Sequence, residues 1–159
     1  MTSRQLTALW VSTAFAAATT LALAPPAHAA LGGNADSVSA DSTALKGQLH
    51  STPLVQYDVQ EITVGTLVIR EYVTRAGQVF AVTWQGPVPP DLRQLLGSYF
   101  PEFQSAAAAA HRANPGIRRQ LSVSQPDLVV QSGGRLRDFH GLAYLPSLVP
   151  AGVSLSDLQ

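Results

Sequence analysis

Three consecutive runs of the chain alternate hydrophobic and polar side chains, or are rich in β-branched and aromatic residues, as β-strands are. They are Tyr57–Val64, Thr66–Thr74 and Gln78–Gln85. The spacer Arg75–Gly77 fits a three-residue hairpin loop whose glycine adopts the left-handed conformation, so the second and third runs are expected to pair antiparallel. Gly65 separates the first two runs less clearly, and either a turn or one long strand with a glycine bulge fits it.

A helical pattern follows the proline-rich segment Gly86–Pro90. One apolar stripe at helical spacing contains Leu92, Leu95, Leu96, Tyr99, Phe100 and Phe103. Pro101 lies inside this pattern and lacks an N–H, which predicts a kink or a break into two helices there. The alanine run Ala106–Ala110 favours helix, and Asn114–Gly116 ends it.

The remaining segments are shorter. Ile117–Ser124 is interpreted as a basic connector, Pro126–Gln131 as a short strand, Ser132–Gly134 as a turn and Leu136–Leu145 as a strand that is apolar on both faces. The order β-β-β-α-β-β predicts an α+β fold, in which an antiparallel sheet of about five strands has one kinked helix packed on one face.

The N-terminal residues resemble a cleavable signal peptide. Arg4 precedes the apolar, alanine-rich segment Leu6–Ala24, and Ala27–Ala29 matches the small-x-small pattern of a cleavage site. A membrane anchor is the alternative, because Leu6–Ala24 approaches the ~20 residues that span a bilayer. Several Thr and Ser residues and the many alanines favour cleavage after Ala29. We therefore expect a periplasmic or secreted protein without a stable membrane anchor.

This interpretation divides the chain into three parts. Residues 1–29 form the signal peptide, residues 30–54 an extended N-terminal arm, and residues 55–159 a single α+β domain. The arm is predicted because Gly32-Gly33, scattered Ser and Thr, and few large apolar residues give it no clear period.

Composition narrows the classes of partner and of chemistry. Only 13% of the residues are charged, and 10 basic side chains balance 10 acidic ones. A nucleic-acid partner is not expected, because it requires clustered Lys and Arg. The chain has no cysteine, which excludes disulfides, thiolate metal ligands, thiol nucleophiles and lipidation at cysteine.

Several short motifs resemble a known family. Arg70–Val73 (REYV), Gly77–Pro87 (GQVFAVTWQGP), Pro90–Phe100 (PDLRQLLGSYF) and Leu128–Gly134 (LVVQSGG) are similar to a family of exported Gram-negative bacterial proteins catalogued as a domain of unknown function. The resemblance implies export, and it transfers no activity, cofactor or catalytic residue.

No motif predicts a catalytic, metal or cofactor site. His50, His111 and His140 lie in three separate segments, whereas a zinc or copper site needs three or four converging ligands. The chain contains no Gly-x-Ser-x-Gly nucleophile motif, and Gly133-Gly134 lacks the lysine of a phosphate-binding loop. These observations favour a non-catalytic protein over an enzyme, and they leave the question open.

Glu71 is the most informative charged residue. It shares a strand face with Leu67, Ile69 and Val73, whereas Arg70 faces the other side. A carboxylate among apolar groups needs a partner, so we expect a structural ion pair with Arg93, Arg135 or Arg137. The alternative is a charge that binds a ligand.

Aromatic residues supply further candidates for binding. Phe80, Val82 and Trp84 are expected on one face of their strand, and Val79, Ala81 and Thr83 on the other. Trp84 fits either a lid on the core or an interface anchor. The candidate binding residues are Glu71, Trp84, Arg137, His140 and Tyr144.

These observations favour a non-catalytic module that binds, or helps assemble, another protein of the envelope or a secreted protein, with strand addition to the arm or to a sheet edge as one route. One alternative is a small secreted hydrolase that uses Glu71 with His140 or Asp91. Another is a periplasmic binder of small ligands, with Trp84, Tyr144 and Arg137 around an apolar pocket.

Overall fold

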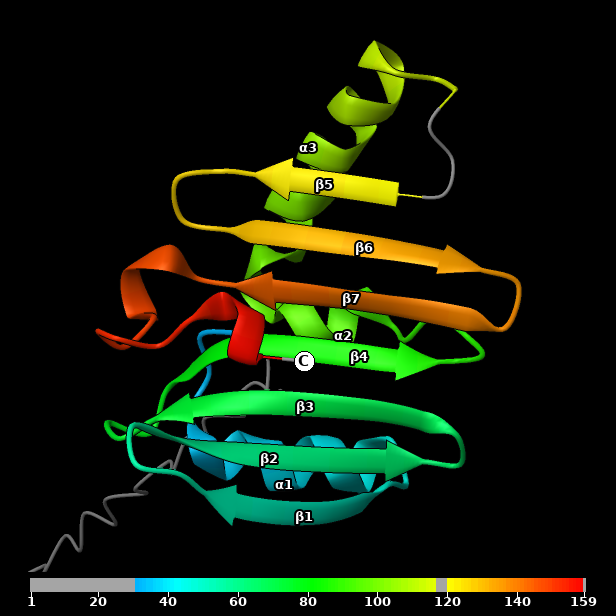
Figure 1. The fold of residues 1–159 in the computed structure, drawn as a ribbon. Helices are drawn as coiled ribbons and strands as arrows, with labels where there is room; N and C mark the ends of the chain where they lie inside the picture. The colour runs from blue at the N-terminus through cyan, green and yellow to red at the C-terminus, as the bar shows by residue number, and fades with distance from the viewer. Residues whose placement is uncertain (1–30, 117–119, 159) are drawn as a thin grey trace, which may run out of the picture.

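A computed structural model describes residues 31–116 and 120–158. Its centre is a seven-stranded sheet with the spatial order β1-β2-β3-β4-β7-β6-β5, in which every neighbouring pair is antiparallel (Figure 1). The strands are β1 (Gln48–Pro53), β2 (Tyr57–Val64), β3 (Leu67–Thr74), β4 (Val79–Gly86), β5 (Gln120–Ser124), β6 (Val129–Arg135) and β7 (Asp138–Tyr144).

The α-helices all lie behind one face of this sheet (Figure 1). They are α1 (Ala35–Ala44), α2 (Leu92–Leu96) and α3 (Phe100–Ala113), and the 3-10 turns are η1 (Gly97–Tyr99), η2 (Pro146–Leu148) and η3 (Leu155–Asp157). The larger core cluster lies between these helices and the sheet. The C-terminal segment passes in front of the opposite face, which the α-helices leave open.

The predicted fold class is wrong. The sheet has seven strands and not about five, the helices and strands follow one another in a different order, and strands outweigh helices, so that the protein is mostly β. Both missed strands are sheet edges. Every residue of β1 is exposed, and Val123 is the buried residue of β5. Strands of this kind show no alternation of buried apolar and exposed polar residues, so the hydrophobic pattern does not reveal them.

The N-terminal segment is part of the sheet domain. Where an extended arm was expected, α1 packs on the sheet and β1 pairs with β2. Asn34 caps α1 by accepting a hydrogen bond from the Ser37 N–H at 3.0 Å. Gly32 and Gly33 exchange backbone hydrogen bonds with Val79 of β4 at 2.8 and 2.9 Å. The expected signal peptide and Ala30 lie outside the described residues.

The helical region is divided, as its sequence predicts, but at an earlier residue. α2 ends at Leu96, η1 follows, and α3 begins at Phe100 with Pro101 in its first turn. Proline is tolerated in a first turn because that N–H has no partner within the helix. Leu95, Leu96 and Phe103 of the apolar stripe are buried against the sheet.

The β3–β4 hairpin confirms the prediction for Arg75–Gly77. Gly77 has φ +81°, and its N–H donates to the Thr74 carbonyl at 2.8 Å. A register shift at Tyr72/Val73 then breaks the alternation of β4. Val79 therefore packs in the core with Val82 and Trp84, whereas Phe80 lies in the cluster on the open face, which corrects the faces expected for these two residues.

Glycines in β6 and β7 make room for large side chains of neighbouring strands. A Cβ at Gly141 would overlap the ring of Trp84, which crosses from β4. A Cβ at Gly134 would lie 2.6 Å from Cδ1 of Phe139. The segment Ser132–Gly134, expected to be a turn, is therefore strand, because its glycines serve close packing and not chain reversal.

None of the helices formed by the described residues has the length and apolar character needed to cross a membrane.

Replacement of Gly141 by alanine should destabilise the domain by about 1–3 kcal/mol, because the added methyl group must displace the Trp84 ring and approach the Gln131 carbonyl. Chemical denaturation would measure the loss. Gly116→Ala is the control, since no atom lies within 4 Å of its added Cβ and its φ is not positive. Equal stability of the two variants would contradict the close packing of Trp84 on Gly141.

Candidate functional site

The open face of the sheet carries two cross-strand rows of mostly polar side chains. The strand register places Arg70, Thr83, Leu142, Gln131 and Ser122 next to one another across β3, β4, β7, β6 and β5. The second row contains Gln85, His140, Gly133 and Gln120. Neighbouring strands lie ~4.8 Å apart, so the first row extends over about 19 Å.

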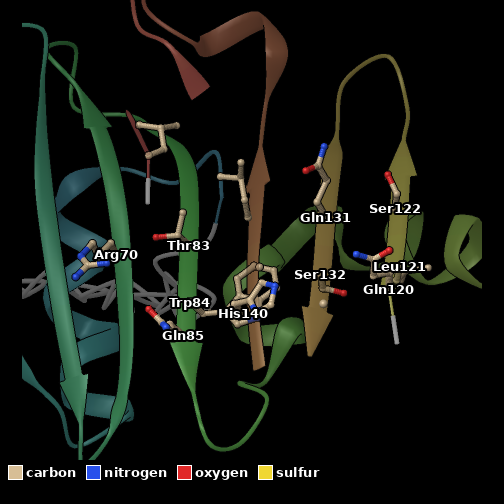
Figure 2. A pocket seen from close by; sticks show the side chains of 14 residues that line it. Arg70, Thr83, Trp84, Gln85, Gln120, Leu121, Ser122, Gln131, Ser132 and His140 are labelled. Carbon is tan, nitrogen blue, oxygen red and sulfur yellow. The ribbon is translucent and has the colours of Figure 1, made fainter. Parts of the chain in front are cut away.

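These rows form the floor of a groove with a volume of about 610 Å³. Figure 2 shows their labelled side chains on successive strands, with Arg70 at one end and Ser122 at the other. Amide and hydroxyl groups dominate, and each can both donate and accept hydrogen bonds. The groove therefore suits a polar ligand without net charge.

The two basic side chains of the groove, Arg70 and His140, differ in their surroundings. The Arg70 Nε donates to the Glu61 carboxylate at 2.8 Å, and each of these side chains is about one third exposed. His140 is exposed and its ring lies over Gly133, where a Cβ would be 3.0 Å from Nε2. Arg70 is thus neutralised within the protein, and His140 is presented to solvent.

The C-terminal segment closes one end of the open face. Leu158 is fully buried in a cluster with Tyr57, Tyr72 and Phe80, and it also borders the groove. The aromatic rings of this cluster meet at 5.7–6.2 Å between centroids. The groove is consequently the part of this face that the segment leaves accessible.

The five candidate residues from the sequence do not form one site. His140 and Trp84 both line the groove. Trp84 is 4% exposed and belongs mainly to the core, and Tyr144 packs against the cluster under the C-terminal segment. Arg137 lies in the β6–β7 turn with φ +67° and borders a smaller hollow of about 400 Å³. The expected apolar pocket of Trp84, Tyr144 and Arg137 is therefore not formed.

Sequence reasoning missed most residues of the groove, including Gln85, Gln120, Gln131 and Ser122. Isolated glutamines and serines carry no motif. Recognition of β5 as a strand would have revealed them, because cross-strand neighbours follow directly from the register.

Glu71 lies on the opposite face and is fully buried. Its neighbours by register are Gln60 of β2 and Val82 of β4. The expected ion pair with an arginine is wrong: Arg93 packs over the Phe100 ring at 4.6 Å, and Arg135 and Arg137 are exposed at the β6–β7 turn. Within residues 31–116 and 120–158, neither carboxylate oxygen of Glu71 has a hydrogen-bond partner.

A second carboxyl group is buried close by. Asp41 of α1 is 1% exposed, and its Oδ1 accepts a hydrogen bond from the Gln94 Nε2 of α2 at 3.1 Å. Burial, reinforced by the negative charge of Asp41, raises the pKa of Glu71 from 4.5 to about 8.

The residues proposed for hydrolysis are not brought together. Glu71 lies under the helices, whereas His140 lies on the open face. Asp91 instead caps α2, where it accepts a hydrogen bond from the Arg93 N–H at 2.9 Å. No cluster of three or more His, Cys, Asp or Glu side chains suited to a metal ion occurs in the part of the chain that the structure describes.

Comparison with known proteins gives a family and nothing more specific. A family model described as "Protein of unknown function (DUF2844)" matches residues 27–158. Neither a curated protein nor a solved structure matches the chain.

The pKa of Glu71 predicts a pH-dependent stability of the folded protein. The unfolded chain ionises Glu71 above pH 4.5, whereas the folded chain holds the proton up to about pH 8, so unfolding releases a proton between these values. The free energy of unfolding should therefore fall as the pH rises through this window, by up to ~1.4 kcal/mol per pH unit.

Urea denaturation of the protein at several pH values would measure this slope, and Glu71→Gln should remove most of it. Glu61→Gln is the matched control, because Glu61 is partly exposed and paired with Arg70. A slope that is the same in the Glu71→Gln variant would assign the pH dependence to other groups.

Proposed function

The chain belongs to the DUF2844 family of unknown function, and from its structure we propose that it is an exported, non-catalytic module that binds an extended, uncharged segment of another envelope or secreted protein. The observation that supports this most strongly is the groove on the open face, which crosses β3, β4, β7, β6 and β5.

The chemistry of the groove favours a peptide segment as the ligand. Gln85, Gln120 and Gln131 provide amide donors and acceptors that match the N–H and C=O groups of an extended backbone. The only salt bridge at the groove, among the described residues, is the internal Arg70–Glu61 pair, so a highly charged partner finds no complement there. Such a site has the character of a shallow protein interface and not of an enclosed catalytic pocket.

Export is part of the same proposal. Arg4, the apolar segment Leu6–Ala24 and the small-x-small sequence Ala27–Ala29 support secretion and removal of residues 1–29. The absence of cysteine means that the domain needs no disulfides outside the cytoplasm. The working protein is then periplasmic or secreted.

Blocking the groove should abolish binding of the partner. The double variant Gln131→Arg/Ser122→Arg places two long, charged side chains on adjacent strands of the groove, at positions that are exposed and register partners. We expect at least a tenfold loss of captured partner when the purified protein is immobilised and incubated with envelope extract, quantified by mass spectrometry after crosslinking.

Gln104→Arg/Ser105→Arg is the matched control, since it makes the same substitutions at exposed positions of α3. Binding unchanged in the control and lost in the groove variant would support the proposal. Equal capture by the groove variant would refute the groove as the binding site.

Processing of the N-terminus gives an independent prediction. Protein isolated from the periplasm or the culture medium should begin at Ala30, as determined by intact mass and N-terminal sequencing. Recovery of the chain from Met1 in the cytosol would contradict export.

A further inference from the structure

Arg70 lies at one end of the groove with most of its hydrogen-bond donors unused (Figure 2). Its Nε donates to the Glu61 carboxylate at 2.8 Å, and its side chain is 33% exposed. A guanidinium group has five N–H donors. Within residues 31–116 and 120–158, no group accepts a hydrogen bond from Nη1 or Nη2 of Arg70. Glu61 therefore holds the guanidinium group in place, and the Nη donors are left for a ligand.

A smaller hollow of about 400 Å³ continues the groove at this end. Arg70 and Gln85 line both the groove and the hollow, so the two spaces meet at these side chains. From there the hollow extends along β3 and β4 to Val68 and Pro87, and it reaches Arg137 in the β6–β7 turn. A ligand that lies along the groove and ends at Arg70 therefore has space beside it for its last side chain.

Charged residues around this hollow leave one positive charge in excess. Arg70 is balanced by Glu61. The β6–β7 turn has Arg135 and Arg137 beside Asp138, three exposed residues that form no salt bridge within the described part of the chain. One added carboxylate balances this excess. Because the turn is exposed to solvent, the attraction should weaken as the salt concentration rises.

The donors at this end of the groove favour a carboxylate over an uncharged carbonyl group. Nη1 and Nη2 of an arginine lie in one plane and can donate to both oxygens of a carboxylate at once. The side-chain amide of Gln85 is a further donor that borders the groove and the hollow. A segment whose side chains are all uncharged has one such group, the α-carboxylate at its C-terminus.

We propose that Arg70 and Gln85 form a subsite for a C-terminal carboxylate, so that the segment bound in the groove is the C-terminal end of the partner protein. The inference rests on the proposed function of the groove. The first row of the groove extends over about 19 Å, which accommodates roughly six residues of extended chain at ~3.3 Å each. The carboxylate accepts hydrogen bonds from the Arg70 Nη groups and from the Gln85 amide, and the last side chain enters the hollow.

The test uses two pools of hexapeptides that differ only at the C-terminus. Both pools are N-acetylated and contain Ala, Gln, Ser, Thr and Val in random order, and one ends in a free carboxylate whereas the other ends in a carboxamide. NMR of the isotope-labelled protein follows binding through the backbone amides of Gln131 and Ser122 and through the Nε–H of Arg70. In low salt, the apparent Kd of the carboxylate pool should be lower by at least about fivefold, because charge-assisted hydrogen bonds are stronger than neutral ones. In about 1 M NaCl this difference should shrink.

Matched variants assign the difference to the subsite. Arg70→Gln/Glu61→Gln removes both charges of the ion pair at the groove, and it should reduce the ratio of the two Kd values to less than about twofold. The control Arg75→Gln/Asp58→Asn removes an ion pair of similar length, 3.0 Å, whose residues do not line the groove. In this control the ratio should stay at its full size.

The outcomes distinguish the subsite from the groove. Equal Kd values for the two pools, with shifts at Gln131 and Ser122, would overturn the carboxylate subsite and leave the groove as the binding site. An undiminished ratio in Arg70→Gln/Glu61→Gln would overturn the role of Arg70. Absence of shifts with both pools would overturn the subsite together with the groove. The comparison of the two pools on the unaltered protein applies even if a variant does not fold.

Discussion

The constraint on which the account depends is that a carboxyl group removed from water must be either protonated or paired. The constraint applies to Glu71, which is buried at the junction of β3, α1 and α2, beside Asp41. A domain of this size with one open sheet face has limited apolar burial, and a leucine at this position would be the simpler choice for stability. Burial and the negative charge of Asp41 raise the pKa of Glu71 to about 8, so Glu71 satisfies the constraint by keeping its proton at neutral pH.

Because the α-helices cover only one face of the sheet, the residues of the larger core and the residues of the groove lie on opposite faces. The helices and the segment around Leu31 cover one face, on which Glu71 is buried. Thr83, Gln131 and His140 lie on the other face and line the groove. The C-terminal segment protects the aromatic cluster around Phe80 at one end of that open face. Substitutions in the groove therefore touch solvent-facing positions, while changes at the helix-covered face act through the core.

The sequence reveals the strands and helices in which apolar residues recur at regular spacing. The strands around Ile69 and Val82, the helical stripe with Leu95 and the turn at Gly77 are all visible, as is the burial of Glu71 among apolar residues. β1 and β5 are not visible, because a sheet edge with one buried residue or none leaves no alternation. The groove was missed for the same reason, since Ser122 and Gln120 become neighbours of Gln131 and His140 only through the register of β5, β6 and β7. The expected ion pair of Glu71 with an arginine is wrong because the position of a residue along its strand does not reveal which side chains the covering helices bring to it.

The most direct test of the central claim is a titration of the Glu71 side chain by carbon-detected NMR in the folded protein. The account predicts that Glu71 is protonated at neutral pH, because burial and the negative charge of Asp41 raise its pKa to about 8. A Glu71 that is ionised at neutral pH, with a pKa close to 4.5, would contradict the account.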